Sequence, residues 1–487
     1  MSRARRVDWL LAALAVTVAA TAEAQGAPKK QPDAERKKCT FQVDNVDREV
    51  MRTEPAPGTI NYFAGGNVRL SCVGTQVRIS SDSLAAYAGT VVQFIGNVKY
   101  QDSSMVMTTD FGTYYKDDER WESQGNVVAT NKKTGTVLKG PFLNYWRAVE
   151  GMRDTSEVEA TGRPTVTYVP DDTVGGREKA EPYTIVGDVL RFRGSNRIWG
   201  WGHVTVNRSD LATRSDSLDL DTGPRGLGIL SGGYPEMRGL GPDSFTINGR
   251  RIDLELDHRE LNYVTAKGDG KVVREALELV GDTIRMRVSD KKLEQTVAWG
   301  RNLRPKAVSP DYEIIADSLA FDTPEQKLTE ARLFGNAWIS GRPDTTTVLA
   351  EPDSLADSTA APDSTAAHPD TAAGGTGLIL DRDWIAGDTV VANFAQRDSA
   401  GTARTALTRL FAQGQARSFY RVKSENPRGR PSLSYSRGRR ITITMKTGDR
   451  TGVERVDIGG KVDGVQLEPQ LRVIRVRADS APPPPIP

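Results

Sequence analysis

GTVVQFIGNVKY, residues 89–100, is the stretch that decides the fold. Its apolar residues Val92, Phe94 and Val98 alternate with polar residues, and a period of two is typical of a β-strand with one buried face. The alternation passes through Gly96. The same kind of phrase, an apolar alternation through a glycine, returns at residues 198–204, 333–339, 410–416 and 456–462. The chain therefore repeats one type of strand many times.

A second phrase alternates with the first and consists of an Asp followed by apolar residues at positions +2 and +4. It begins at Asp82, Asp188, Asp216, Asp282, Asp317 and Asp388. Asp82 precedes Gly96 by 14 residues and Asp110 by 28, and such fixed spacings predict antiparallel hairpins that stack as one repeated unit. The inward glycine marks a row where backbones approach or a strand bends. The Asp is expected to accept a hydrogen bond from a turn N–H.

These patterns predict an all-β protein with almost no helix. The hydrophobic share of 38% and the 46 glycines fit strands that have one wet face and many tight turns. Two stretches break the pattern. Residues 343–377 are rich in Pro, Asp, Ser, Thr and Ala and predict a disordered insertion, and residues 471–487 form a Pro-rich tail ending in APPPPIP.

The N-terminus has the features of a secretory signal peptide. Arg3, Arg5 and Arg6 precede an apolar run, and the small-residue site AEA ends at Ala24. The apolar run is shorter than the ~20 residues that span a bilayer. We therefore expect residues 1–24 to be removed; an uncleaved anchor is the alternative.

An exported chain favours oxidised cysteines, and the two that occur are Cys39 and Cys72. The sequence predicts a disulfide between them, with two free thiols as the alternative. The net charge of +2 provides no sequence-wide basic field, so nucleic acid is not an expected partner.

We find no constellation of residues that indicates catalysis. The three histidines lack metal-ligand spacing, and no nucleophile elbow or phosphate loop occurs. We expect no enzyme activity, no metal and no cofactor.

Three aromatic residues are predicted on the strand face opposite the glycines: Trp199, Trp201 and Trp338. They could form an aromatic strip that binds a ligand, or they could cover a second layer of the fold. A basic tract at 428–440 could bind phosphate groups, or its charges could prevent exposed strand edges from pairing with other chains.

Residues 81–146, together with the signal peptide and weaker echoes downstream, resemble the OstA-like family, which includes LptA and the periplasmic part of LptD in lipopolysaccharide export. The resemblance implies an elongated, open β-jellyroll with an apolar groove that shields acyl chains between two membranes. It divides the chain into OstA-like segments at 25–180, 181–342 and 378–470. This chain is much longer than a simple bridge unit of that family.

The inner strand faces must either pack shut or bind a ligand. The residues that we expect to line a lipid groove are Val92, Phe94, Val98, Leu190, Phe192, Val204 and Val206. The resemblance implies lipopolysaccharide or a related lipid as the ligand. It also implies end-to-end β pairing with other export components, an outer-membrane translocon as a partner, and a place in the periplasm, either free or at the outer membrane. A structural β-stack without ligand and a glycan-processing enzyme remain as alternatives.

Overall fold

The computed structural model describes residues 37–169, 181–240, 244–257, 260–289, 292–341, 382–399, 402–422, 431–446 and 453–468. The predicted signal peptide, the insertion at 343–377 and the Pro-rich tail lie outside these residues.

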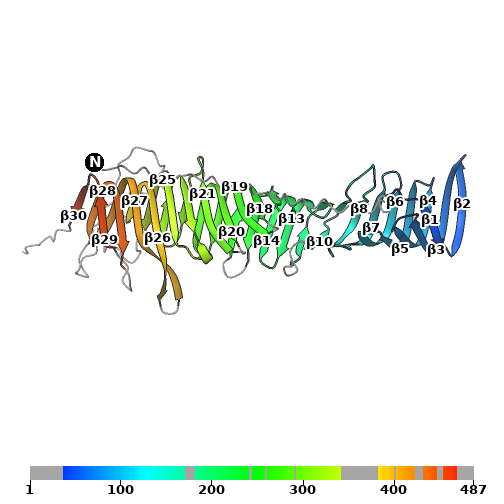
Figure 1. Ribbon diagram of the computed structural model, residues 1–487, viewed down its shortest axis with the longest axis horizontal. Helices are drawn as coiled ribbons and strands as arrows, with labels where there is room; N and C mark the ends of the chain where they lie inside the picture. Colours follow the sequence, from blue (N-terminus) through cyan, green and yellow to red (C-terminus); the bar gives the residue numbers. More distant parts are fainter. Residues whose placement is uncertain are drawn as a thin grey trace, which may run out of the picture.

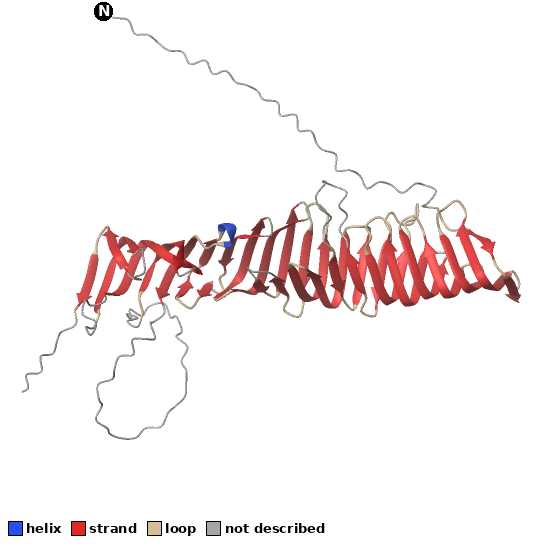
Figure 2. Ribbon diagram, turned by 90° about the horizontal axis from the view of Figure 1, so that it is seen from below, coloured by secondary structure: helices blue, strands red, loops and turns tan. Residues whose placement is uncertain are grey.

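The described residues form one long sheet of thirty strands, in which the pairings are antiparallel. The strands cross the long axis of an elongated molecule, with β1 and β2 at one end and β29 and β30 at the other (Figures 1 and 2). The described part has no α-helix and contains one short 3-10 helix, Pro324–Gln326. The predicted all-β class with repeated antiparallel hairpins is therefore confirmed.

The strands of the N-terminal third are β1 (Phe41–Asn45), β2 (Arg48–Ala56), β3 (Thr59–Cys72), β4 (Arg78–Tyr87), β5 (Val91–Gln101), β6 (Met105–Tyr115), β7 (Arg120–Asn131), β8 (Val137–Trp146), β9 (Glu157–Thr161) and β10 (Thr165–Tyr168). The central strands are β11 (Tyr183–Val186), β12 (Val189–Arg193), β13 (Arg197–Arg208), β14 (Leu211–Asp221), β15 (Leu227–Ser231), β16 (Glu236–Gly239), β17 (Phe245–Asn248), β18 (Arg251–Asp257), β19 (Glu260–Arg274) and β20 (Leu277–Ser289). The C-terminal strands are β21 (Lys292–Trp299), β22 (Lys306–Val308), β23 (Tyr312–Ile315), β24 (Ser318–Asp322), β25 (Glu330–Gly341), β26 (Trp384–Ser399), β27 (Thr402–Val422), β28 (Ser432–Met445), β29 (Val453–Gly459) and β30 (Asp463–Leu467).

The inward glycines mark a sharp bend in the middle of the long strands. In β5, Ile95 pairs with Phe111 and Val98 pairs with Thr109, so the register shifts across Gly96 and Asn97. These two residues have φ values of +77° and +47°, a left-handed backbone that Gly adopts freely and Asn tolerates. The same pair of positive φ values recurs at 66–67, 125–126, 202–203, 335–336 and 414–415. We call this row of bends the spine.

The spine divides the sheet into two walls. Wall A contains the short strands β1, β10, β11, β16, β17, β22, β23 and β30, and wall B contains β2, β9, β12, β15, β18, β21, β24 and β29; each long strand contributes one half to each wall. The turns lie along the free edge of wall A, rim A, or along that of wall B, rim B, except where two consecutive short strands are joined at the spine, as between β9 and β10. The two rims face each other across the open side of the fold, which we call the mouth.

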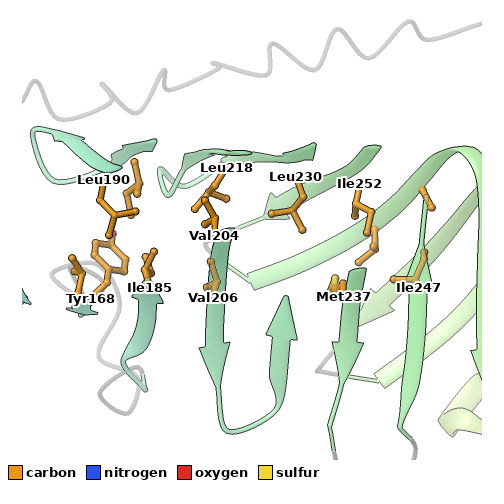
Figure 3. Close-up of a cluster of buried hydrophobic side chains, with 14 of the residues drawn as sticks. Tyr168, Ile185, Leu190, Val204, Val206, Leu218, Leu230, Met237, Ile247 and Ile252 are labelled. Atoms are coloured by element: carbon orange, nitrogen blue, oxygen red, sulfur yellow. The ribbon is translucent and has the colours of Figure 1, made fainter. Parts of the chain in front are cut away.

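The core lies between the two walls. Figure 3 shows Leu190, Leu218 and Leu230 of wall B pointing toward Ile185 and Met237 of wall A. All five side chains are at most 2% exposed. One apolar layer therefore runs along the molecule, and its burial is the main force that holds the walls together.

The repeated Asp lies on the spine, opposite the bend of the next strand. A Cβ added to Gly96 would lie 2.4 Å from Oδ2 of Asp82, and Nδ2 of Asn97 donates to the same oxygen at 2.8 Å. Asp110 accepts from Asn126 in the same way. At Asp82 and Asp110 a side-chain amide takes the place of the expected backbone donor, whereas Asp282 accepts from the backbone N–H groups of Asn302 and Leu303, as predicted.

The sheet continues across both boundaries between the three predicted segments. β10 pairs with β11 across residue 180, and β25 pairs with β26 across the insertion. The three segments are thus parts of one hydrogen-bonded sheet.

Candidate functional site

The predicted groove residues lie on the inner faces of the walls. Six of them are at most 7% exposed: Val92, Phe94, Val98, Leu190, Val204 and Val206. Their side chains pack between the walls in the continuous core. Phe192 is only partly buried and packs against this core from the rim B end of β12. Contact of these residues with a lipid stays a prediction.

A pocket opens in the mouth where β8, β9, β10 and β12 meet. Its cavity volume is about 70 Å³, well below the about 300–1,000 Å³ of typical small-molecule sites, so it is a shallow opening that a ligand could only begin to enter. Its apolar lining comes from both walls: Met105, Ala129, Leu138, Val158, Val166, Tyr168 and Phe192. Its polar lining consists of Ser104, Asn131, Thr134, Thr136, Ser156 and Ser195, together with the backbone at Gly194. Phe192 is thus the predicted groove residue that the structure places in this pocket.

Tyr145 bridges the mouth at one end of the pocket. Its hydroxyl, from wall B, donates to Oδ2 of Asp102 on rim A at 2.8 Å and lies 3.2 Å from Oγ of Ser104, a pocket residue. Asp102 is 3% exposed and also accepts from the Tyr100 hydroxyl and from the backbone N–H of Met105. Burial, and then the charge of Asp102, raises the pKa of both Tyr100 and Tyr145.

A disulfide-anchored segment, residues 37–40, crosses the mouth farther toward the N-terminus. The structure joins Cys39 to Cys72, at the rim A end of β3, in the disulfide that the sequence predicts. The N–H of Cys39 donates to Oε1 of Glu119 on rim B at 2.6 Å. Arg147 donates to the carbonyl of Lys37 at 2.6 Å and to Glu119 at 2.7 Å. We call this segment the strap, because it is bonded to both rims.

Tyr168 bridges the mouth at the other end of the pocket. Its hydroxyl, from wall A, lies 2.8 Å from Oγ1 of Thr222 and donates to the carbonyl of Ser195 at 3.2 Å, both in turns of rim B. The pocket is therefore a window in the mouth between the Tyr145 bridge and the Tyr168 bridge.

The tyrosines at the rims could not be predicted from the sequence, because they follow the same alternating pattern as the core residues of the strands. Tyr100, Tyr114, Tyr145 and Tyr168 each occupy the last inward position before a rim, and each extends an apolar alternation. The usable signal is a tyrosine that ends such an alternation beside a polar turn, as in VKYQD at 98–102. A hydroxyl at that position reaches a rim while its ring stays in the core. The hydroxyls of Tyr145 and Tyr168 bond to the opposite rim, and those of Tyr100 and Tyr114 bond to the rim of their own wall.

The outer face carries the predicted aromatic residues and a further exposed row. Trp201 is 42% exposed, and the guanidinium of Arg197 lies 5.3 Å from the ring centre of Trp199. Ile95 pairs with Phe111 on the same outer face, and both are exposed. The tryptophans thus point away from the core and from the pocket.

The remaining polar candidates form no reactive cluster in the described part of the chain. Nδ1 of His203 lies 2.9 Å from Asp188 on the spine, while His258 and His368 lie outside the described residues. Of the basic tract, the described Arg437, Arg439 and Arg440 are exposed on β28. Among the residues that the structure describes, no group of three potential metal ligands comes together. Nor does any helix within this part have the length and apolar character to cross a membrane.

The chain matches no protein-family model, and no curated protein is similar enough to count as a match.

Proposed function

We propose that the protein binds an acyl chain of lipopolysaccharide, or of a related lipid, in the mouth pocket and shields it between the two walls during export through the periplasm. The observation that carries the proposal is the pocket itself, whose apolar lining comes from both walls of a folded sheet. Each CH₂ group buried there contributes about 0.8 kcal/mol. The polar rim residues leave the lipid headgroup in water.

Two further features support a bridging role. Each end of the sheet presents unpaired strand edges within the described residues, on β1 and β2 at one end and on β29 and β30 at the other. Such edges are suited to pairing with strands of other proteins. We propose other lipopolysaccharide-export components and an outer-membrane translocon as these partners, in agreement with the signal-like N-terminus.

A purely structural β-stack is the second candidate. It is favoured by the closed packing of the inner faces, where Phe94 and Leu190 are fully buried. Under this alternative the mouth pocket is a packing irregularity that takes up no lipid.

Photocrosslinking distinguishes the two functions. A photoreactive amino acid replaces Phe192, which lines the pocket, or Trp201, which is exposed on the outer face of β13. Purified protein is then incubated with lipopolysaccharide. We expect crosslinks from position 192 and few from position 201. Equal labelling of the two positions, or none from position 192, would contradict lipid binding in the pocket.

A pair of charge substitutions separates binding from folding. In Phe192→Glu the carboxylate can stay hydrated at the mouth, so the protein should fold and lose lipid binding. In Val98→Glu the carboxylate enters a site that is 1% exposed, and burial of an unpaired ion should prevent folding. Circular dichroism melting beside crosslinking measures both effects. A folded Phe192→Glu protein that binds lipid like the wild type would argue against the proposal.

A further inference from the structure

The C-terminal end of the sheet carries a concentration of positive charge. The last four strands, β27 to β30, contain eight arginines and three acidic residues. Figure 1 shows β28, β29 and β30 at the end of the molecule opposite β1 and β2. In the sequence, residues 402–487 contain 17 Lys and Arg and 7 Asp and Glu, while the whole chain has a net charge of +2. A basic C-terminal end thus belongs to a chain that is otherwise acidic.

Five exposed cationic side chains gather around the last bends of the spine. They are Arg417, Arg437, Arg439, Arg440 and Lys461, which we call the basic patch. Arg417 on β27 lies directly opposite Arg437 on β28. A Cβ on Gly460, in the turn between β29 and β30, would lie 2.6 Å from the Cβ of Arg439. Arg437 points away from the core because its neighbour Ser436 is buried, and successive side chains of a strand point to opposite faces.

The described residues around the basic patch leave most of its charge unpaired. Asp463 pairs with Arg437 at 3.2 Å, and both side chains are more than 60% exposed. Within the described part of the chain, Arg417, Arg439 and Arg440 form no ion pair. Like charges directly opposite on neighbouring strands, as in the pair Arg417 and Arg437, destabilise a sheet. An anion beside the two guanidinium groups would relieve this repulsion, and phosphate matches their geometry.

An apolar patch adjoins the basic patch on the outer face of wall A. Tyr435 pairs with Val465, and Leu433 pairs with Leu467. The side chains of Val465 and Leu467 are 55% and 57% exposed. The ring centre of Tyr435 lies 6.2 Å from that of Trp384, and Trp and Tyr are enriched where proteins meet the interface between a bilayer and water. We call these five residues the apolar patch.

Cations beside exposed apolar side chains fit the surface of an anionic bilayer. Lys and Arg are attracted to the negative surface potential of such a bilayer, and apolar side chains next to them enter its headgroup region. A second copy of the chain fits the basic patch less well. At the other end of the molecule, residues 37–87 contain six basic and five acidic residues, so that end offers no complementary charge.

We propose that the basic and apolar patches dock the C-terminal end of the molecule on the surface of an anionic lipid bilayer. The arginines bind lipid phosphates, and Val465 and Leu467 enter the headgroup region. The inference goes beyond the proposed function and does not require a lipid in the mouth pocket. Crosslinking from position 192 therefore succeeds or fails independently of this docking.

The test is co-sedimentation of the full chain with phosphatidylcholine vesicles that contain or lack phosphatidylglycerol. One variant combines Arg437→Gln, Arg439→Gln and Arg440→Gln. The matched control combines Arg214→Gln, Arg238→Gln and Arg250→Gln, three arginines of the central part of the sheet whose side chains are more than half exposed. Both variants lose the same charge from exposed sites, so circular dichroism melting should show that both stay folded.

We expect the wild type and the control to bind the vesicles that contain phosphatidylglycerol and to release them at high salt. The C-terminal triple variant should bind at least about tenfold more weakly. Equal binding by the two triple variants, or no binding of the wild type to either kind of vesicle, would overturn the proposal.

Two further arms separate a bilayer from other anionic partners. The double variant Val465→Ser and Leu467→Ser should bind vesicles at least about threefold more weakly, and inorganic phosphate at constant ionic strength should not release the wild type. Release by phosphate, with the double variant unchanged, would assign the patch to a free phosphate and overturn bilayer docking. Sedimentation velocity supplies the last check, since oligomers that disappear in the C-terminal triple variant would assign the patch to a second copy instead.

Discussion

At the scale of single residues, the fold depends on two neighbouring positions with left-handed backbone. Gly125 has a φ of +80°, and a Cβ placed on it would lie 2.5 Å from Oδ2 of Asp110. The next residue, Asn126, donates to the same carboxylate. One Asp, one Gly and one Asn thus form this bend, whereas His203 takes the place of the Asn beside Asp188; the bend divides a strand between two walls.

We predict that Gly125→Ala destabilises the protein more than Gly135→Ala. Both glycines have a positive φ, +80° and +76°, but a Cβ on Gly135 would meet nothing within 4 Å. Backbone strain of about 1–2 kcal/mol applies to both, and the overlap with Asp110 adds to it only at Gly125. Chemical denaturation measures the difference. Adding Asp110→Ala to Gly125→Ala should recover part of the loss; a strictly additive double variant would show that the overlap is unimportant.

Much of this local chemistry could be predicted from the sequence. The spacing from Asp82 to Gly96 predicts the hairpin and the inward glycine predicts the bend, because both depend on residues close together in the chain. The partner of Asp82 could not be predicted with the same ease. It depends on the register of the next strand, which brings the amide of Asn97 to the carboxylate.

At the scale of elements, the strap and the tyrosine bridges close the N-terminal third of the mouth. Glu119 and Arg147 have side chains that are 0% and 5% exposed, and they form an ion pair at 2.7 Å. Burial, and then the charge of Glu119, raises the pKa of Tyr114, whose hydroxyl donates to this carboxylate. The strap therefore rests on a buried charge pair with several hydrogen bonds.

We predict that Glu119→Gln costs about 3–5 kcal/mol, because it removes the carboxylate that pairs with the buried Arg147 guanidinium. Asp118→Asn is the matched control. Asp118 is half exposed and pairs with Arg120 at 3.3 Å, so its loss should cost less than about 1 kcal/mol. Equilibrium denaturation of both variants, with the disulfide intact, gives the comparison. Similar losses in the two variants would show that the strap contributes little.

The site itself was only partly predictable from sequence. Phe192 was predicted to face a groove, and it lines the pocket. The other six predicted residues have the same alternation, but the opposite wall fills the space above them. Which inward residue stays uncovered depends on the width of the mouth, and that width is set by contacts such as Tyr145 to Asp102, 43 positions apart.

At the scale of the whole molecule, titration should limit stability from both sides of neutral pH. Burial raises the pKa of Asp253, but hydrogen bonds and charges from Lys267 and Arg251 outweigh it, so the pKa lies below its usual value. The pKa of Glu313 is lowered likewise, by Lys306 and Arg382 against burial. Carboxylates of this kind stabilise the fold above their unfolded pKa, and the stabilisation is lost as pH falls through the folded pKa.

The buried tyrosines act in the opposite range. The pKa values of Tyr100 and Tyr145 are raised by burial and by Asp102, so their contribution is complete below the unfolded value of about 10 and is lost as pH rises above it. We predict a melting temperature that is nearly constant between about pH 5 and pH 9 and falls on either side. Calorimetry across pH measures it. Tyr145→Phe should weaken the alkaline fall; an unchanged alkaline limb would assign that fall to other groups.

The alternation of turns between the two rims has a consequence for how such a molecule can change its size. Two consecutive long strands, each of which covers both walls, bring the chain back to the rim from which it started, so any even number of them can be added or removed without altering the cross-section. Each long strand, or each pair of short strands that together cover both walls, lengthens the stack by ~4.8 Å. The number of repeats therefore fixes the distance between the two end strands. A change in that number would change the distance that the protein can span.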